Sequence, residues 1–181
     1  VEAVIARLDG IRVISPDLPG FGVSTPLTKA PHSIAGYGRW LGGFIAALGL
    51  SAPPVVLGHS FGSMIASHAI ADGMPARALI LVNPITTDPK VAAGRGITGA
   101  TRAFYGVTRA MPNGLARVWL GNWLIVQFMS MNLVKTPDAE LRRWIHEEHH
   151  RYFNGFSDPR TVAEAFDASV STDVRAAAAR V

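Results

Sequence analysis

Residues 55–64 read Val55-Val56-Leu57-Gly58-His59-Ser60-Phe61-Gly62-Ser63-Met64. An aliphatic run ends in Gly-x-Ser-x-Gly and passes directly into residues with helical spacing. This order predicts a strand, a sharp turn and a helix, with one serine hydroxyl raised above the end of the strand. Gly58 and Gly62 have no Cβ atom, so we expect the strand and helix to approach closely around Ser60, whose backbone is strained. The flanking strand and helix make the motif more specific than a chance match in a loop.

The composition is that of a folded domain with a large interior. Of the 181 residues, 49% are hydrophobic and only 17% are charged, which excludes disorder. The net charge is +4, but the arginines are scattered and no basic run is interleaved with aromatic residues, so we expect no nucleic-acid partner. The absence of cysteine excludes disulfides, thiolate metal sites and a cysteine nucleophile.

The most apolar stretch, residues 118–134, contains Gly121, Asn122, Gln127 and two further polar residues. These interruptions favour a buried or substrate-facing helix over a transmembrane segment, with contact to a membrane surface as the less favoured alternative. No signal peptide is visible, and we expect a cytoplasmic protein. The chain begins at Val1 rather than Met, so we expect its true start to be absent.

Residues 1–84 alternate between helical and extended patterns. Strands are predicted at 11–14, at 55–57 and at 78–82, and their uninterrupted apolar character is typical of parallel strands buried on both faces. Helices are predicted over 1–9, over 33–48 with Ser33 as N-cap and Gly49 at the end, and from Ser60 to about Asp72. This alternation predicts a parallel sheet with helices on both faces.

Residues 85–172 show helical patterns and no convincing strand. Helices are predicted at 103–111, 115–133, 138–152 and 159–170, and the glycine-rich residues 94–101 are interpreted as a flexible connector. We expect a helical lid over the carboxyl edge of the sheet, where ligands of α/β proteins bind. The predicted organisation is a partial core over 1–84, a lid over 85–172 and a truncated return to the core over 173–181.

Two polar residues in the first half of the chain, Asp17 and His32, are candidates for a functional role. Asp17 begins a Pro/Gly-rich turn that runs to Ser24, and an aspartate there is expected to hydrogen-bond its own loop rather than act in catalysis. His32 precedes the predicted helix 33–48 and is interpreted as a surface or capping histidine.

The chain resembles an α/β-hydrolase. The resemblance is carried by Asp17-Leu18-Pro19-Gly20-Phe21-Gly22-x-Ser24 after a strand, by Gly58-His59-Ser60-Phe61-Gly62, and by the helical insertion after residues 78–82. The order is similar to the lid-bearing branch of esterases, carbon–carbon bond hydrolases and cofactor-free haloperoxidase-like enzymes. The expected fold class is α/β: an incomplete α/β-hydrolase fold, with three visible parallel strands, flanking helices and an all-helical lid.

The resemblance implies roles for residues of the motif. Ser60 would be the nucleophile that forms an acyl-enzyme, and the backbone N–H of Phe61 would donate to the oxyanion. Gly58, His59 and Gly62 would support the turn, since the His59 side chain points to the other side of the backbone from Ser60. No cofactor is implied.

Other parts of the family's site have no counterpart in the sequence. No loop before residue 10 matches the one that supplies the second oxyanion donor, and we expect the acid and the histidine to lie beyond Val181. Asp88 is the alternative acid, and the histidines of residues 146–150 are less favoured as the base. The sequence is therefore interpreted as a fragment, which we expect to be inactive and poorly soluble.

Residues 146–150 match the zinc motif H-E-x-x-H. On a helix, His146 and His150 would share a face, and Glu147 would be the base for zinc-bound water. The third ligand is not obvious and the surrounding residues are highly polar, so a solvated lid face is favoured and no metal is expected.

The leading functional hypothesis is a serine hydrolase of esters or related acyl substrates, with a small lipophilic acyl substrate as partner. Trp119, Trp123, Phe128 and Met129 are candidates to line a lipophilic pocket, although they could equally pack the lid. The alternatives are a non-catalytic binding module on the same fold and a carbon–carbon bond hydrolase or haloperoxidase-like enzyme, with a zinc hydrolase that uses His146, Glu147 and His150 as a remote one. The oligomeric state stays open.

Overall fold

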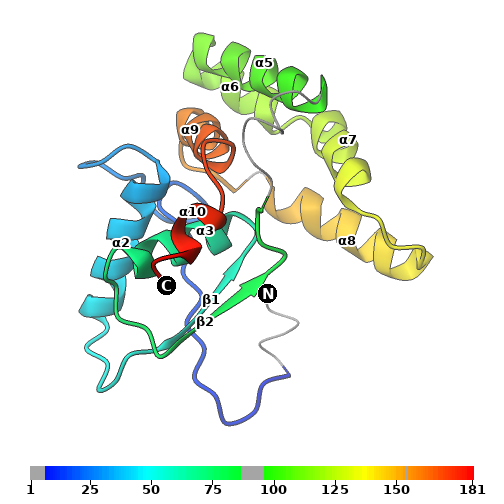
Figure 1. Ribbon diagram of the computed structural model, residues 1–181. Coiled ribbons are helices and arrows are strands. Elements are labelled where there is room, and N and C mark those ends of the chain that lie inside the picture. Colours follow the sequence, from blue (N-terminus) through cyan, green and yellow to red (C-terminus); the bar gives the residue numbers. More distant parts are fainter. Residues whose placement is uncertain (1–6, 87–95, 154) are drawn as a thin grey trace.

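The computed structural model describes residues 7–86, 96–153 and 155–181. Figure 1 shows two parts: a strand pair with α2, α3 and α10 beside it, and further helices beyond the carboxyl ends of the strands. The elements in chain order are α2 (Ile34–Ala47), β1 (Val55–His59), α3 (Phe61–Ala71), β2 (Ala78–Val82), α5 (Gly96–Ala110), α6 (Asn113–Leu120), α7 (Trp123–Leu133), α8 (Ala139–Tyr152), α9 (Pro159–Ser169) and α10 (Arg175–Ala178).

Strands β1 and β2 pair in parallel, in a register that runs from Val55 opposite Ala78 to His59 opposite Val82. Helix α3 makes the crossover between them, as parallel strands require. Val56 is buried against α3 residues, whereas Leu57 and Ile80 are exposed. One face of the strand pair is therefore covered by helices and the other is open. The prediction of strands buried on both faces by flanking helices is wrong for the described residues, since the side chains of Leu57 and Ile80 meet no helix.

The predicted strand at residues 11–14 is wrong. These residues have no regular secondary structure, and Ile11, Val13 and Ile14 are exposed. Within the described residues the sheet has two strands rather than the three expected, because segment 11–14 finds no backbone partner. Most of the helix predicted over 1–9 lies outside the described residues, and residues 7–9 are not helical.

Three helices, α2, α3 and α8, are bounded close to the residues that the sequence predicts. The Ser33 side chain accepts a hydrogen bond from the Gly36 N–H and caps α2, and Gly49 follows with φ +58°. Helix α3 ends at Ala71, with Asp72 as its C-cap. Helix α8 is capped by Asp138, which accepts hydrogen bonds from Glu140 and Leu141.

The helix predicted over 115–133 is in fact two helices. Gly121 caps the end of α6, and the Asn122 side chain accepts a hydrogen bond from the Leu124 N–H to start α7. The interpretation of residues 94–101 as a connector is also wrong over 96–101, which form the start of α5, while residues 94 and 95 lie outside the described part.

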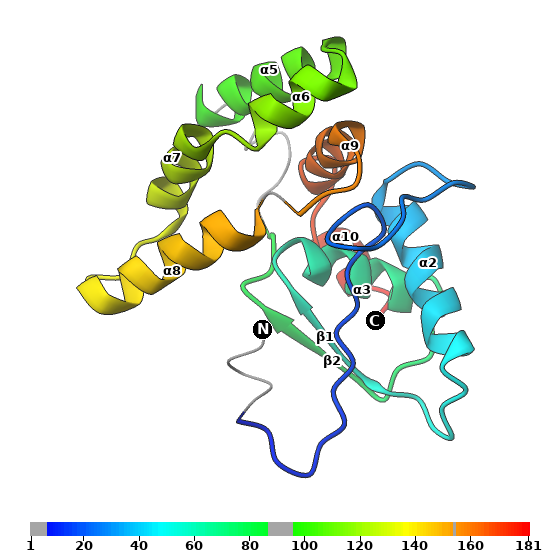
Figure 2. The same ribbon diagram turned by 180° about the vertical axis from the view of Figure 1, so that it is seen from behind.

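Helix α9 joins the distal helices to the core. It packs against α5 and α6, and its Ala165 and Ala168 lie in one buried cluster with Tyr37 of α2 and Met64 of α3. Figure 2 shows α9 between the α5–α6 pair and α2, while the α7–α8 hairpin projects to the opposite side. Helices α7 and α8 pack chiefly against each other.

The loop of residues 18–24 binds the segment that leads into α9. Gly20 O accepts hydrogen bonds from the backbone and side chain of Ser157, and Gly22 N–H donates to Gly155 O. Phe21 pairs with Phe156 as an isolated antiparallel bridge. These backbone contacts fix α9 relative to α2.

A search of the described helices for membrane-spanning segments found none that is long and apolar enough to cross a bilayer.

We expect Ile65→Ala to lower the free energy of unfolding by about 2–5 kcal/mol, because Ile65 is only 2% exposed and its loss leaves a cavity in the shared core. The matched change Leu57→Ala, at a side chain that is 60% exposed, should cost less than about 1 kcal/mol. Urea unfolding followed by circular dichroism measures both. Equal losses at the two positions would contradict the core described here.

Candidate active site

Ser60 occupies the sharp turn between β1 and α3. Its backbone has φ 50° and ψ −116°, a conformation that non-glycine residues rarely adopt. The Ser60 N–H donates to Val82 O at 3.1 Å, so the turn is bonded to β2. Its side chain is partly exposed and makes no capping hydrogen bond to α3. The strained turn therefore presents a hydroxyl that is not engaged by the helix it precedes.

The backbone beyond Ser60 is arranged to stabilise negative charge. Phe61 is the first residue of α3, and the first N–H groups of a helix have no acceptor within it. The helix dipole adds a partial positive charge at the same point. Ser63 is fully buried and donates hydrogen bonds from its N–H and its hydroxyl to Ser60 O, which holds the turn closed.

The two glycines of the motif have different roles. A Cβ atom on Gly58 would lie 2.6 Å from Gly62 O and 2.7 Å from Ser63 Cα, so only glycine lets β1 reach α3 this closely. A Cβ atom on Gly62 would meet nothing within 4 Å, and its φ is not positive. The expectation that both glycines are required sterically is therefore supported at Gly58 alone.

None of the described histidines hydrogen-bonds to the Ser60 hydroxyl. His59 is exposed at the end of β1, on the same side as Val55 and Leu57. Asp88, the alternative acid, lies outside the described residues. The other histidines bond elsewhere: His32 to Glu164, His68 to Asp173 O, His146 and His149 to Ser130, and His150 to Gln127.

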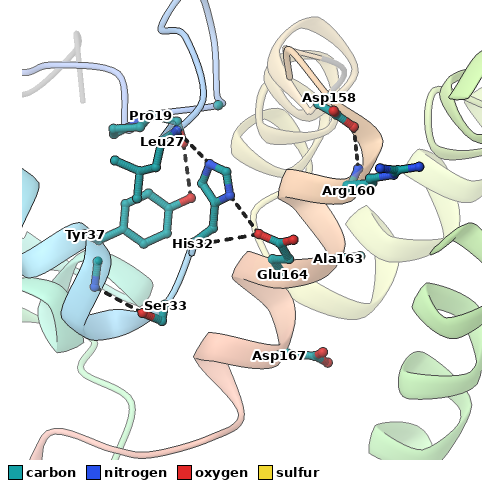
Figure 3. A network of polar contacts seen from close by, with 12 residues as sticks. Pro19, Leu27, His32, Ser33, Tyr37, Asp158, Arg160, Ala163, Glu164 and Asp167 are labelled. Carbon is teal, nitrogen blue, oxygen red and sulfur yellow. Dashed lines mark hydrogen bonds and ion pairs between the residues drawn. The ribbon is translucent and has the colours of Figure 1, made fainter. Parts of the chain in front are cut away.

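His32 is part of a network that links α9 to the start of α2 (Figure 3). The Leu27 N–H donates to His32 Nε2 at 3.0 Å, so Nδ1 carries the proton and donates to Glu164 Oε2 at 2.8 Å. His32 is only 8% exposed, so its interpretation as a surface residue is wrong. Its partner lies 132 residues away, which no local pattern could reveal.

Tyr37 connects this network to the turn at Ser60. Its hydroxyl donates to Pro19 O at 3.2 Å, and its ring meets that of Phe61 edge to face with centroids 5.6 Å apart. Burial, with a smaller contribution from the charge of Glu164, raises the pKa of Tyr37, so the hydroxyl remains a donor. Tyr37 thus contacts both Phe61 and the loop around Pro19.

Asp17 has the structural role expected of it. Its carboxylate accepts the Val23 N–H at 3.1 Å, and its backbone oxygen accepts the Ser24 hydroxyl at 2.9 Å. A Cβ atom on Gly22 would collide with the Asp17 carboxylate, and Gly22 has φ +53°. The Asp17 carboxylate therefore stabilises the loop of residues 18–24, which binds the segment before α9.

The H-E-x-x-H residues lie on α8, and the three histidines at 146, 149 and 150 contact α7. The Ser130 hydroxyl, which is fully buried, lies 2.6 Å from Nδ1 of both His146 and His149. The His150 ring stacks on Trp123 at 5.0 Å, and its Nε2 lies 2.7 Å from Gln127 Oε1. Within the described part of the chain, no group of three or more His, Asp or Glu side chains is placed to hold a metal ion.

The four candidates for a lipophilic pocket do not meet in one cavity among the described residues. Trp119 stacks on Phe104, with ring centroids 5.5 Å apart, and Phe128 is exposed. Trp123 lines a groove of about 550 Å³ between α7 and α8, and Met129 is half-buried on α7. The groove lies on the α7–α8 hairpin rather than at Ser60.

A comparison with models of protein families identifies the family of the chain. The model of the alpha/beta hydrolase family matches residues 3–180, so the chain belongs to that family, as its sequence motifs indicated. The match includes β1, the turn at Ser60 and all the helices described above. A search of curated proteins found no match.

We expect Gly58→Ala to lower the free energy of unfolding by about 3 kcal/mol or more, because the new methyl group meets the backbone of α3. Gly62→Ala is the matched control and should change it by less than about 1 kcal/mol. Chemical unfolding of the two variants measures the difference. Similar destabilisation by both would show that the close approach is not centred on Gly58.

The stability of the protein should depend on pH through His149. Burial lowers the pKa of His149, and the neighbouring His146 and His150 lower it further, so the unfolded chain binds a proton there more readily than the folded one. Stability should therefore fall as pH drops below about 6.5, by less than the roughly 1.4 kcal/mol per pH unit that one proton allows.

Unfolding measured between about pH 7.5 and pH 5.5 tests this contribution. His149→Gln should flatten the dependence. Ser51→Ala, which removes no titratable group from an exposed loop, should leave it unchanged. An equally steep dependence in His149→Gln would rule out His149 as its source.

Proposed function

We propose that this member of the alpha/beta hydrolase family is a serine hydrolase that acts on esters or related acyl compounds through an acyl-enzyme at Ser60. The observation that carries the proposal is the strained backbone of Ser60, φ 50° and ψ −116°, between a parallel strand and a helix. Such strain is maintained where it serves a function.

The chemistry follows from the atoms around the turn. The Ser60 hydroxyl would attack the carbonyl carbon of the substrate, and the leaving alcohol would depart to give the acyl-enzyme, which water then hydrolyses. The Phe61 N–H would donate to the oxyanion of each tetrahedral intermediate. Losing one such donor typically costs about 3 kcal/mol in the transition state.

Attack also requires a base that takes the proton of Ser60. The described histidines make no hydrogen bond to the Ser60 hydroxyl. The reactivity of Ser60 should therefore depend on a base that these histidines do not supply. Helix α6 carries exposed apolar side chains beyond the sheet, Leu115, Val118 and Trp119, and these suit a lipophilic acyl substrate.

The proposal predicts covalent labelling of Ser60 by a fluorophosphonate probe, because that reagent phosphonylates an activated serine. Labelling should quicken when imidazole is added as an external base, and mass spectrometry of the digested protein should place the adduct on Ser60. Ser60→Ala should abolish it.

Ser51→Ala is the matched control, because Ser51 is an exposed loop serine in the same chain, and this variant should label as the unmodified chain does. An adduct that persists in Ser60→Ala would refute the assignment of the nucleophile. Complete absence of labelling at every imidazole concentration would favour a non-catalytic binding module.

A further inference from the structure

One buried hydroxyl of α7 is shared by two histidines of α8. Ser130 is fully buried, and its Oγ lies 2.6 Å from Nδ1 of His146 and 2.6 Å from Nδ1 of His149. A serine hydroxyl carries one proton, so it donates to one of these nitrogens and accepts the N–H of the other. The full set of hydrogen bonds therefore requires that one of the two imidazoles is neutral.

Protonation of both imidazoles disrupts this contact. Each Nδ1 would then carry a proton, and neither ring could accept the hydrogen bond of the Ser130 hydroxyl. Two positive charges would also lie beside the same buried oxygen, where they repel each other and are partly removed from water. Separation of α8 from α7 relieves both effects, because water can then solvate the two rings.

Helix α7 offers no charge to balance two imidazolium groups. Its sequence contains no acidic or basic residue and no histidine, and α8 packs chiefly against α7. The other charged side chains near the histidines belong to α8 itself. Glu148 lies 3.9 Å from Arg151. Glu147 lines the groove between the two helices together with Arg142 and Arg143. These carboxylates are therefore already near arginines of their own helix.

His150 differs from the other two histidines, because its contacts do not depend on a neutral ring. Its Nε2 lies 2.7 Å from Gln127 Oε1, an acceptor, so this nitrogen carries a proton in both charge states. Its ring stacks on Trp123 with centroids 5.0 Å apart, and an imidazolium is attracted to the face of an indole. The pH sensitivity of the hairpin is therefore centred on His146 and His149.

The surroundings of His149 favour its neutral form. Burial lowers the pKa of His149, and the neighbouring His146 and His150 lower it further. These effects are weaker in a hairpin whose helices have separated, so the open hairpin binds protons more readily than the closed one. Falling pH therefore shifts the equilibrium from the closed hairpin toward the open one.

The hairpin can open without disrupting the rest of the molecule. The hydrophobic clusters found among the described residues contain no residue of α7 or α8. Figures 1 and 2 show the hairpin projecting away from the helices that pack beside the strands.

We propose that the α7–α8 hairpin is a pH-sensitive element, closed while His146 or His149 is neutral and open when both are protonated. Opening exposes Val126 and Ser130, which are buried in the closed hairpin. This response is local and precedes unfolding of the core. It does not depend on the chemistry proposed for Ser60.

Hydrogen exchange of the 181-residue chain, followed by mass spectrometry at about pH 7.5 and about pH 5.5, tests the proposal. Each rate is divided by the intrinsic rate of that amide at the same pH, and EDTA is present so that no metal ion bridges the histidines. Peptides from α7 should lose protection about fivefold at the lower pH, whereas peptides from α2 and α3 should keep theirs.

His146→Gln/His149→Gln should give α7 the same protection at both pH values, because glutamine amides can hydrogen-bond to Ser130 but do not titrate. His150→Gln is the matched control and should keep most of the response of the unmodified chain. If the double variant has already lost its protection at neutral pH, His149→Gln alone takes its place and should respond less than the unmodified chain.

Any of four results would overturn the proposal. The first is equal protection of α7 at both pH values in the unmodified chain, and the second is an equal loss of protection in α2 and α3. The third is a full response in the variant that lacks His149. The fourth is a response that is lost in His150→Gln alone.

Discussion

The structure depends on one close contact, between the backbone of β1 at Gly58 and the first turn of α3. With Gly62 O and Ser63 Cα so near the position of a Cβ atom, the chain must reverse within a single residue after His59. Ser60 is that residue, and its positive φ is the consequence. The same reversal puts the Phe61 N–H at a helix start and lets the Ser60 N–H extend the ladder to Val82. The steric constraint and the candidate chemistry therefore have one origin.

A second set of contacts attaches the distal helices to this centre. Asp17 folds the loop that seats Gly155 to Ser157, and the His32–Glu164 hydrogen bond ties α9 to the residues before α2. Tyr37 completes the connection, because it contacts both Pro19 and the ring of Phe61. Helix α9, although far along the chain from α3, is packed in the same core.

Sequence patterns predicted those features whose causes are local. The strand–turn–helix at Ser60, the cap at Ser33 and the role of Asp17 each follow from neighbouring residues. The strand at 11–14 was wrong because an apolar run becomes a strand only when another strand pairs with it. The helix break at Asn122 was overlooked because hydrophobic periodicity continues through it. His32 could not be placed, since its partner is remote in sequence.

The bonds between Gly20 and Ser157 have a consequence for the order of folding. They join residues 137 apart, so forming them requires closure of a loop that includes α2 to α8. The entropy of that closure is lost before the contacts return any free energy, and non-local contacts of this kind slow folding. The contacts among β1, α3 and β2 join residues that are close in the sequence, so they can form first. The contact between residues 18–24 and 155–157 is therefore expected to be among the last to form, and among the first to open under denaturant.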